Sequence, residues 1–371
     1  MRCARRGRTV VPVTTAAHQL VDVDPTSPYF TAMIGLLEDL DREAVGEDAC
    51  EPEYPDYHAA SWRTHNGRQV AWVVVEDDRV VAFAKAFLSS RDNTHLVDLD
   101  LGTAPGHRGR GHGRALLGRV LEVVRAEGRD TVVGGTAVRP GGPEAAWQLH
   151  ERAVADESVT RQGLPGLGTS FARAAGAVVV QTAVRSQVRL PVDPDVLASV
   201  EAEVGHHADG YTTRSWTGCP PADLLDDRAV LAARMSTDPP LGDMDWRPEV
   251  WDADRVRDTY TDWAERGLSV VGAGAVYEAT GRLVAFSEMG RDRRRPDLAY
   301  QFDTIVVPEH RGHRLGVVVK AANLRAVAAA MPEVGRVQTW NALENGPMLR
   351  VNRAMGFVPV GLCPLWQLKL T

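Results

Sequence analysis

The sequence predicts an α/β protein in which a mixed sheet is flanked by helices and two domains follow one another in tandem. Its length of 371 residues suits two domains of ordinary size. An apolar run leads into a loop rich in glycine and arginine at residues 99–113, and again at 301–316. Each loop opens onto a helical pattern. The two copies keep one offset, because 311 − 108 = 203, and this repeat predicts a duplicated domain.

The offset extends well beyond the two loops. It relates Val81-Ala82-Phe83 to Val284-Ala285-Phe286 and Asp100 to Asp303. Chance could align one tripeptide, but it is a poor explanation for a strand, a loop and an upstream hairpin that match together. We therefore expect a first domain over 1–190, a linker over 191–207 and a second domain over 208–371.

Apolar periodicity predicts the elements of the first domain. Leu116, Val120 and Val124 recur at helical spacing, for example, and Asp77-Asp78 interrupt two apolar runs as a hairpin turn does. We expect helices over 28–45, 110–127 and 169–175, a hairpin of 70–75 with 80–88, a central strand over 96–103, and further strands over 131–138 and 178–190. Residues 50–58 form an acidic, proline-rich loop, and 163–168 a linker.

The second domain repeats this order. We expect strands over 211–216, 270–277, 282–289, 301–308 and 337–341, and helices over 221–235, 253–266, 313–330 and 345–355. In the last of these, Asn345 is a good N-cap and Gly356 can end the helix in the left-handed conformation. The basic run 291–295 is interpreted as a solvated turn rather than a nucleic-acid patch.

The start of a helix presents backbone N–H groups without internal partners, so each glycine–arginine loop could bind a phosphate. Neither loop has the Walker pattern, and the Rossmann pattern fails when it is started at Gly109 or at Gly111. The pattern [QR]-x-x-G-x-[GA] remains. Arg108-x-x-Gly111-x-Gly113 fits it fully, and the second loop fits it apart from Arg314.

With these loops and a last helix that ends in Gly356-Phe357, the chain resembles a tandem GCN5-related N-acetyltransferase (GNAT) superfamily protein. The resemblance covers most of both halves and is strongest over 276–362. It implies that acetyl-CoA binds as the acyl donor and that no metal is needed. The residues it assigns to acetyl-CoA are Val306, Val307, Arg311, Gly312, His313, Arg314, Leu315, Gly316, Asn341 and Asn345, with Arg108, Gly109, Arg110, Gly111, His112 and Gly113 in the first domain.

Acetyl transfer to an amine needs a base, because an alkyl amine is mostly protonated at neutral pH. Strand alternation puts Phe302, Thr304 and Val306 on one face and Gln301, Asp303 and Ile305 on the other, where the family opens its acceptor cleft. Asp303 is therefore the first candidate, with Asp100 as its counterpart, and Glu288 is the second. The alternatives are a structural aspartate for Asp303 and a solvated hairpin residue for Glu288.

The family often carries a tyrosine proton donor four residues before the glycine of the last helix. Here that position is Asn352, and in the first domain it is Ala172. Asn352 could hydrogen-bond the sulfur but has no titratable proton, so water could serve instead. We expect the second domain to be the catalytic copy.

Composition narrows the remaining possibilities. The net charge of −7 disfavours nucleic-acid binding, and no segment approaches the length of a membrane span. The four cysteines have neither zinc-site nor disulfide-framework spacing. Residues 1–13 lack the apolar core of a signal peptide, and we expect a disordered start there. We expect a cytoplasmic protein, monomeric or homodimeric.

The leading hypothesis is an acetyl-CoA-dependent N-acetyltransferase that acts on a primary amine of a small molecule. The alternative, motivated by the missing tyrosines, is a non-catalytic acyl-CoA sensor or scaffold. A third hypothesis, acetylation of RNA or protein, has less support, because the chain is acidic and no sequence feature indicates a peptide-binding groove.

Overall fold

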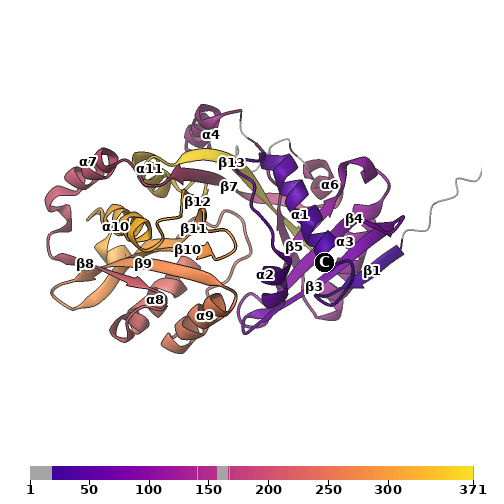
Figure 1. Ribbon diagram of the computed structural model, residues 1–371, viewed down its shortest axis with the longest axis horizontal. Helices are drawn as coiled ribbons and strands as arrows, with labels where there is room; N and C mark the ends of the chain where they lie inside the picture. The colour runs from indigo at the N-terminus through magenta and orange to yellow at the C-terminus, as the bar shows by residue number, and fades with distance from the viewer. Residues whose placement is uncertain (1–18, 140, 157–165, 167, 371) are drawn as a thin grey trace, which may run out of the picture.

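The computed structural model describes residues 19–139, 141–156, 166 and 168–370, and its strands join into one sheet that runs through both halves (Figure 1). The predicted class, a mixed sheet flanked by helices, is confirmed. The expected disordered start at 1–13 and most of the expected linker at 163–168 lie outside the described residues.

The first half follows the predicted order, with four additions: helices at 55–60 and 143–155 and strands at 19–23 and 63–64 were not predicted. Its elements are β1 (Gln19–Val23), α1 (Phe30–Val45), α2 (Pro55–Ala60), β2 (Arg63–Thr64), β3 (Gly67–Glu76), β4 (Arg79–Ser89), β5 (Leu96–Thr103), α3 (His112–Ala126), β6 (Thr131–Gly135), α4 (Pro143–Ala155), α6 (Thr169–Ala174) and β7 (Val178–Arg189).

The second half also follows its predicted order and adds one long strand at the end of the chain. Its elements are α7 (Pro194–Val204), β8 (Tyr211–Thr217), α8 (Leu225–Met235), α9 (Ala253–Glu265), β9 (Leu268–Tyr277), β10 (Arg282–Asp292), β11 (Leu298–Val306), α10 (Leu315–Ala330), β12 (Arg336–Ala342), α11 (Gly346–Ala354) and β13 (Val358–Lys369). Asn345 caps α11 as expected, and Gly356 has the left-handed φ of 83°.

Helices cover both faces of the sheet. In the first half, Trp72 and Val74 face α3, and Ala71, Val73 and Val75 alternate with them to face α1. In the second half, α10 covers one face and α8 with α9 the other. Because both faces are covered, the central strands are apolar over most of their length.

The two halves exchange their last strands. The strand order is β1-β3-β4-β5-β6-β13-β7-β12-β11-β10-β9-β8, so β13 pairs with β6 of the first half and β7 pairs with β12 of the second. Figure 1 shows yellow β13 and magenta β7 crossing between the halves. The proposed units 1–190 and 208–371 thus share one sheet, and neither would keep all its strand partners alone.

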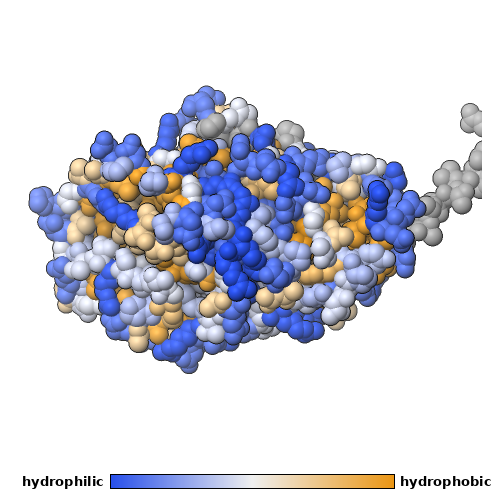
Figure 2. Space-filling model, viewed as in Figure 1, coloured by the Kyte–Doolittle hydropathy of each residue, from blue (hydrophilic) through white to orange (hydrophobic). Residues whose placement is uncertain are grey.

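Charged residues join the halves along the outside of the sheet. Arg294 pairs with Asp56 at 3.0 Å, and Arg336, on β12, donates to the backbone oxygen of Asp48. Figure 2 shows hydrophilic residues gathered over the middle of this face, where the halves meet. Arg294 is mostly buried, so the interpretation of 291–295 as a solvated turn is wrong for this residue. No helix in the described parts of the chain is long and apolar enough to cross a membrane.

The exchange of strands predicts that Trp366 stabilises the whole sheet. Trp366, on β13, is 5% exposed, and its indole N–H donates to Thr136 Oγ1 of the first half at 2.9 Å. We expect Trp366→Ala to lower the free energy of unfolding by about 3–5 kcal/mol. Urea denaturation followed by circular dichroism measures the change. The exposed Trp246 is the control, and its replacement by Ala should cost less than about 1 kcal/mol. Equal effects of the two changes would contradict the exchange.

Candidate active site

Each half contains a gap between two parallel strands. β5 and β6 pair only from Leu96 with Thr131 to Asp98 with Val133, and β11 and β12 pair only from Leu298 with Arg336 to Tyr300 with Gln338. Both central strands run several residues beyond these pairs. Their free edges leave backbone N–H and C=O groups that a ligand can pair with.

The backbone N–H groups of Val306 and Val307, which were both expected to bind the donor, point to opposite edges of β11. The N–H of Val307 donates to Val284 O at 3.0 Å, on the β10 side. Successive N–H groups of a strand point to opposite edges, so the N–H of Val306 points into the gap. Val306 is thus available to a ligand as expected, whereas the expectation for the Val307 amide is wrong in this structure.

A β-bulge reshapes β11 beside the gap. Ser287 pairs with Thr304 and Met289 with Gln301, so Phe302 and Asp303 both lie opposite one residue of β10. The bulge reverses the expected alternation at its start. Phe302 packs against Trp263 of α9 with ring centroids 4.9 Å apart, and does not face α10. β4 and β5 pair without such a shift, so only the second half carries the bulge.

The two glycine–arginine loops share an arginine–backbone hydrogen bond but differ in the residue that precedes the helix. Arg108 Nε donates to Thr103 O at 3.0 Å, and Arg311 Nε donates to Val306 O at 3.2 Å, so each arginine braces its loop against its own strand. Gly111 precedes α3 with φ 92°, whereas Arg314 precedes α10 with φ 54°. A side chain is strained in this left-handed region, so the first loop adopts the turn at lower cost.

The first loop borders a cavity of about 900 Å³. Residues 107–114 form one wall, and Phe83, Leu101 and Phe171 are among the apolar side chains opposite. A Cβ added at Gly109 or Gly111 would meet no atom within 4 Å, so the loop surface is open. The space and the free N–H groups at the start of α3 fit a pyrophosphate with an attached chain.

Asp303 lines a second cavity, of about 470 Å³, on the α8 and α9 side of the sheet. Glu249 and three tryptophans, Trp246, Trp251 and Trp263, are among its other walls. Aromatic faces and carboxylates together suit a cationic ligand such as an amine. Asp303 thus lies between the β11/β12 gap and a cavity whose walls suit a cationic ligand.

Burial raises the pKa of Asp303 to about 6, against the opposing effect of the Arg228 charge. Its carboxylate makes no hydrogen bond to any described residue. In the first half the counterpart Asp100 differs, because Lys85 Nζ lies 3.1 Å from its Oδ2. The Asp303 carboxylate thus lines a cavity without an ion-pair partner among the described residues, whereas Asp100 is paired.

Glu288 is fully buried, so its interpretation as a solvated hairpin residue is wrong. Arg228 Nη2 donates to its Oε2 at 2.8 Å, and the hydroxyl of Tyr260 donates to its Oε1. The carboxylate is committed to this buried ion pair, which leaves Asp303 as the better placed base. Sequence reasoning missed Arg228 and Tyr260, because both lie far from Glu288 in the chain.

Asn352 lies in a buried polar network. Lys320 Nζ donates to Asn352 Oδ1, and Asn352 Nδ2 donates to Asn341 Oδ1 at 2.6 Å. Lys320 is 1% exposed, and burial lowers its pKa to about 7. It follows Gly316 by one turn of α10 and so lies on the same face of the helix, and a Cβ on Gly316 would lie 3.9 Å from Val306.

Lys320 is the titratable group that sequence reasoning missed. On α10, Lys320 and Asn323 are fully buried, whereas the apolar Val318 and Ala322 are only half-buried, so apolar periodicity does not indicate the buried face here. A comparison of the two copies at the offset of 203 would have indicated Lys320, because polar residues in one copy correspond to apolar residues in the other. It relates four buried or half-buried polar residues around the gap to apolar ones in the first half: Ser287 to Ala84, Thr304 to Leu101, Lys320 to Leu117 and Asn323 to Val120.

The comparisons with known proteins agree with this geometry. Residues 34–154 match the sequence model of the Acetyltransferase (GNAT) family. A solved tandem GNAT protein from the clavulanic acid biosynthesis pathway is 27% identical, with a TM-score of 0.71 over 95% of this chain and 98% of that one. A GCN5-related N-acetyltransferase from Sphaerobacter thermophilus shares the fold at 16% identity, with a TM-score of 0.58 over 94% and 95%. No curated protein sequence matches the chain.

The buried pair predicts that Glu288 matters for stability. We expect Glu288→Gln to lower the free energy of unfolding by about 3 kcal/mol, because Arg228 would keep its buried charge without a counter-ion. Chemical denaturation measures this. The matched control is Glu309→Gln, whose carboxylate is exposed and should be neutral to replace. A Glu288→Gln protein of unchanged stability would show that the pair is not structural.

Proposed function

Because the chain is a tandem protein of the GCN5-related N-acetyltransferase superfamily, we propose that it transfers an acetyl group from acetyl-CoA to a primary amine of a small molecule. The superfamily supports acyl-CoA-dependent acetyl transfer in general; the amine acceptor is our proposal. The observation that carries it is the position of Asp303, at a bulge between the β11/β12 gap and the tryptophan-lined cavity.

Binding of the donor is assigned to groups around the second gap. The amides of 311–316, at the start of α10, would hold the pyrophosphate, and the Val306 N–H would pair with the pantetheine arm. Arg311 braces that loop through Val306 O and pairs with Asp238 at 2.6 Å. Asn345 is occupied as the cap of α11, so its support for the donor is indirect. Bound acetyl-CoA supplies an activated thioester.

Asp303 acts as the base in this proposal. With a pKa of about 6 it is ionised at neutral pH, and it can take the proton that an ammonium must lose before its nitrogen attacks. Glu249 and the tryptophan faces would hold the amine in the cavity before that step. A backbone N–H on the free edge of β11 would donate a hydrogen bond to the thioester carbonyl oxygen and stabilise the negative charge that develops there.

Lys320 would supply the proton to the departing sulfur. Asn352 stands where many family members have tyrosine and has no proton to lose, but it accepts a hydrogen bond from Lys320. Near neutral pH a substantial fraction of Lys320 is protonated, because its pKa is lowered to about 7. The ammonium form would give its proton and the neutral amine would remain, a form that burial favours.

The first half has features that favour the alternative, a non-catalytic acyl-CoA site. Its loop is unstrained and open, but Asp100 is paired with Lys85, and apolar residues occupy the positions that correspond to the buried polar residues of the second half. We infer a division of roles, in which the first half binds acyl-CoA without transfer and the second half performs the chemistry.

The base assignment predicts the pH dependence. In an amine panel assayed by release of free CoA thiol, kcat/KM should rise with pH through about 6, as Asp303 ionises. Asp303→Asn should lower kcat by roughly 100-fold or more and remove this rise, with unchanged affinity for acetyl-CoA. Asp100→Asn is the matched control and should keep activity. If Asp303→Asn retains full activity, Asp303 is structural.

The assignment of Lys320 as the proton donor predicts the alkaline side of the pH profile of kcat/KM. Wild-type kcat/KM should fall above pH about 7, as Lys320 loses its proton. Lys320→Met should lower kcat and abolish this fall, because no group remains to titrate there. Lys369→Met, on the surface, is the control. An alkaline limb that survives in Lys320→Met would exclude Lys320 as the donor.

The division of roles predicts two acetyl-CoA sites per chain. Calorimetry should give a stoichiometry near two, falling to one in Gly111→Val, because a branched side chain is strongly disfavoured at φ 92°. Transfer should persist in that variant. Gly118→Val, within α3, is the control for a valine in the same element. Loss of transfer in Gly111→Val would give the first half a catalytic role.

A further inference from the structure

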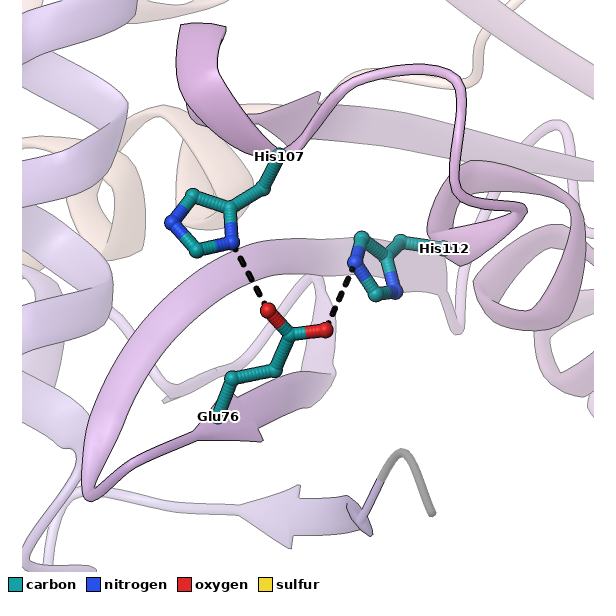
Figure 3. Close-up of side chains that lie close together, drawn as sticks. All are labelled: Glu76, His107 and His112. Atoms are coloured by element: carbon teal, nitrogen blue, oxygen red, sulfur yellow. Dashed lines mark hydrogen bonds and ion pairs between the residues drawn. The ribbon is translucent and has the colours of Figure 1, made fainter. Parts of the chain in front are cut away.

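A carboxylate and two imidazoles converge behind the first glycine–arginine loop (Figure 3). Glu76 is the last residue of β3, His107 lies in the 3₁₀ turn Pro105–His107, and His112 is the first residue of α3. His107 Nδ1 lies 2.8 Å from Glu76 Oε2, and His112 Nε2 lies 3.2 Å from Glu76 Oε1. The three ligand atoms all lie within 4.8 Å of one another.

These separations are close to those of a metal site. Zinc bonds to histidine nitrogen and carboxylate oxygen are about 2.0–2.2 Å long, so two ligand atoms at a tetrahedral zinc lie about 3.3 Å apart. The two nitrogen–oxygen distances differ from that value by a few tenths of an ångström. The third separation, between the two imidazole nitrogens, is no more than 4.8 Å, and the His107 ring is only half-buried. Two imidazoles with one carboxylate select a first-row transition cation over Mg²⁺ or Ca²⁺, which prefer oxygen ligands.

We propose that Glu76, His107 and His112 form a site for a divalent transition cation such as Zn²⁺, which fixes the first glycine–arginine loop to the end of β3. Cysteine spacing predicts no zinc site in this chain, but the cluster contains no cysteine. With three protein ligands, the fourth position would be left for water or another small ligand.

The surroundings of the cluster are compatible with a cation. His112 is 1% exposed and held in place by the start of α3. Arg110 is a competing charge, because its Nη1 lies 3.2 Å from Glu76 Oε2. Its side chain is half exposed and can move into solvent when a cation binds.

The second half provides an internal comparison. Glu76 pairs with Arg79, and Tyr277 pairs with Arg282, which lies 203 residues later, so Tyr277 occupies the place of Glu76. His107 corresponds to His310, whose Nδ1 lies 2.8 Å from the hydroxyl of Tyr211, and His112 corresponds to Leu315. The second loop adopts the same turn with aromatic and apolar side chains behind it. The histidine–carboxylate cluster is therefore not required to form the turn.

The position of the site suggests what a cation would do. His107 and His112 flank the segment 108–111, which contains two glycines with positive φ, Gly109 and Gly111. A cation bound to both histidines and to Glu76 would hold the two ends of this segment at a fixed distance and limit its motion. It would also add positive charge near the proposed pyrophosphate position. Both effects would strengthen phosphate binding by the first loop.

Metal titration tests the proposal without any acyl donor or acceptor. After treatment with a chelator and buffer exchange, the full chain is titrated calorimetrically with ZnCl₂, and in parallel with CoCl₂ while visible absorption is recorded. We expect one equivalent to bind, with cobalt absorption typical of nitrogen and oxygen ligands. Glu76→Gln and His107→Gln should each weaken zinc binding by roughly 100-fold.

His310→Gln is the matched control, because it removes the corresponding histidine of the second loop and should leave zinc binding unchanged. Circular dichroism confirms that each variant is folded. The proposal is overturned if the wild-type chain binds no zinc at 100-fold excess over protein. It is also overturned if Glu76→Gln and His107→Gln, both folded, bind as tightly as the wild type. Neither result depends on acetyl transfer, so the proposed function is tested separately.

Discussion

The short parallel pairing of β11 with β12 is the constraint on which the proposed chemistry depends. The strands are hydrogen-bonded only as far as Tyr300 and Gln338, and the rest of β11 keeps a free edge. The bulge at Phe302 and Asp303 lies next to this edge and turns a carboxylate toward the cavity beyond the sheet. The pairing of the backbone thus determines where a thioester could lie and where Asp303, the proposed base, is located.

The same arrangement has diverged between the two copies. The first half keeps a glycine at the strained position of its loop and an open cavity, but it has apolar residues where the second half has buried polar ones, and Asp100 is paired with Lys85. The second half has a strained Arg314 and a set of buried polar residues around its gap. A duplicated fold allows this, because each copy needs to keep only part of the original site. The exchanged strands β7 and β13 then keep the copies in one folded unit.

Local patterns in the sequence were sufficient for most of the fold. The positions of β5, α1 and α9 follow from apolar periodicity, and the end of α11 follows from Asn345 and Gly356. The last strand, β13, was missed because its partners β6 and β7 lie far away in the chain. The exchange of strands is a property of long-range pairing, which periodicity does not encode.

The site was predictable only where its residues follow a motif. Asp303 and the two loops came from the repeat, and the structure brings Asp303 to a cavity. The face on which Phe302 lies was mispredicted, because a single extra residue in β11 changes which side chains share a face. Lys320, Arg228 and the cluster of Glu76 with two histidines depend on tertiary contacts, so no local spacing indicates them.

A crystal structure of the chain with acetyl-CoA would test the central claim most directly. Our account predicts a donor molecule in the second half, with its pantetheine arm hydrogen-bonded to the Val306 N–H and its thioester between Asp303 and Lys320. A donor seen only beside Gly111, with the β11/β12 gap filled by side chains from α10 and α11, would contradict it.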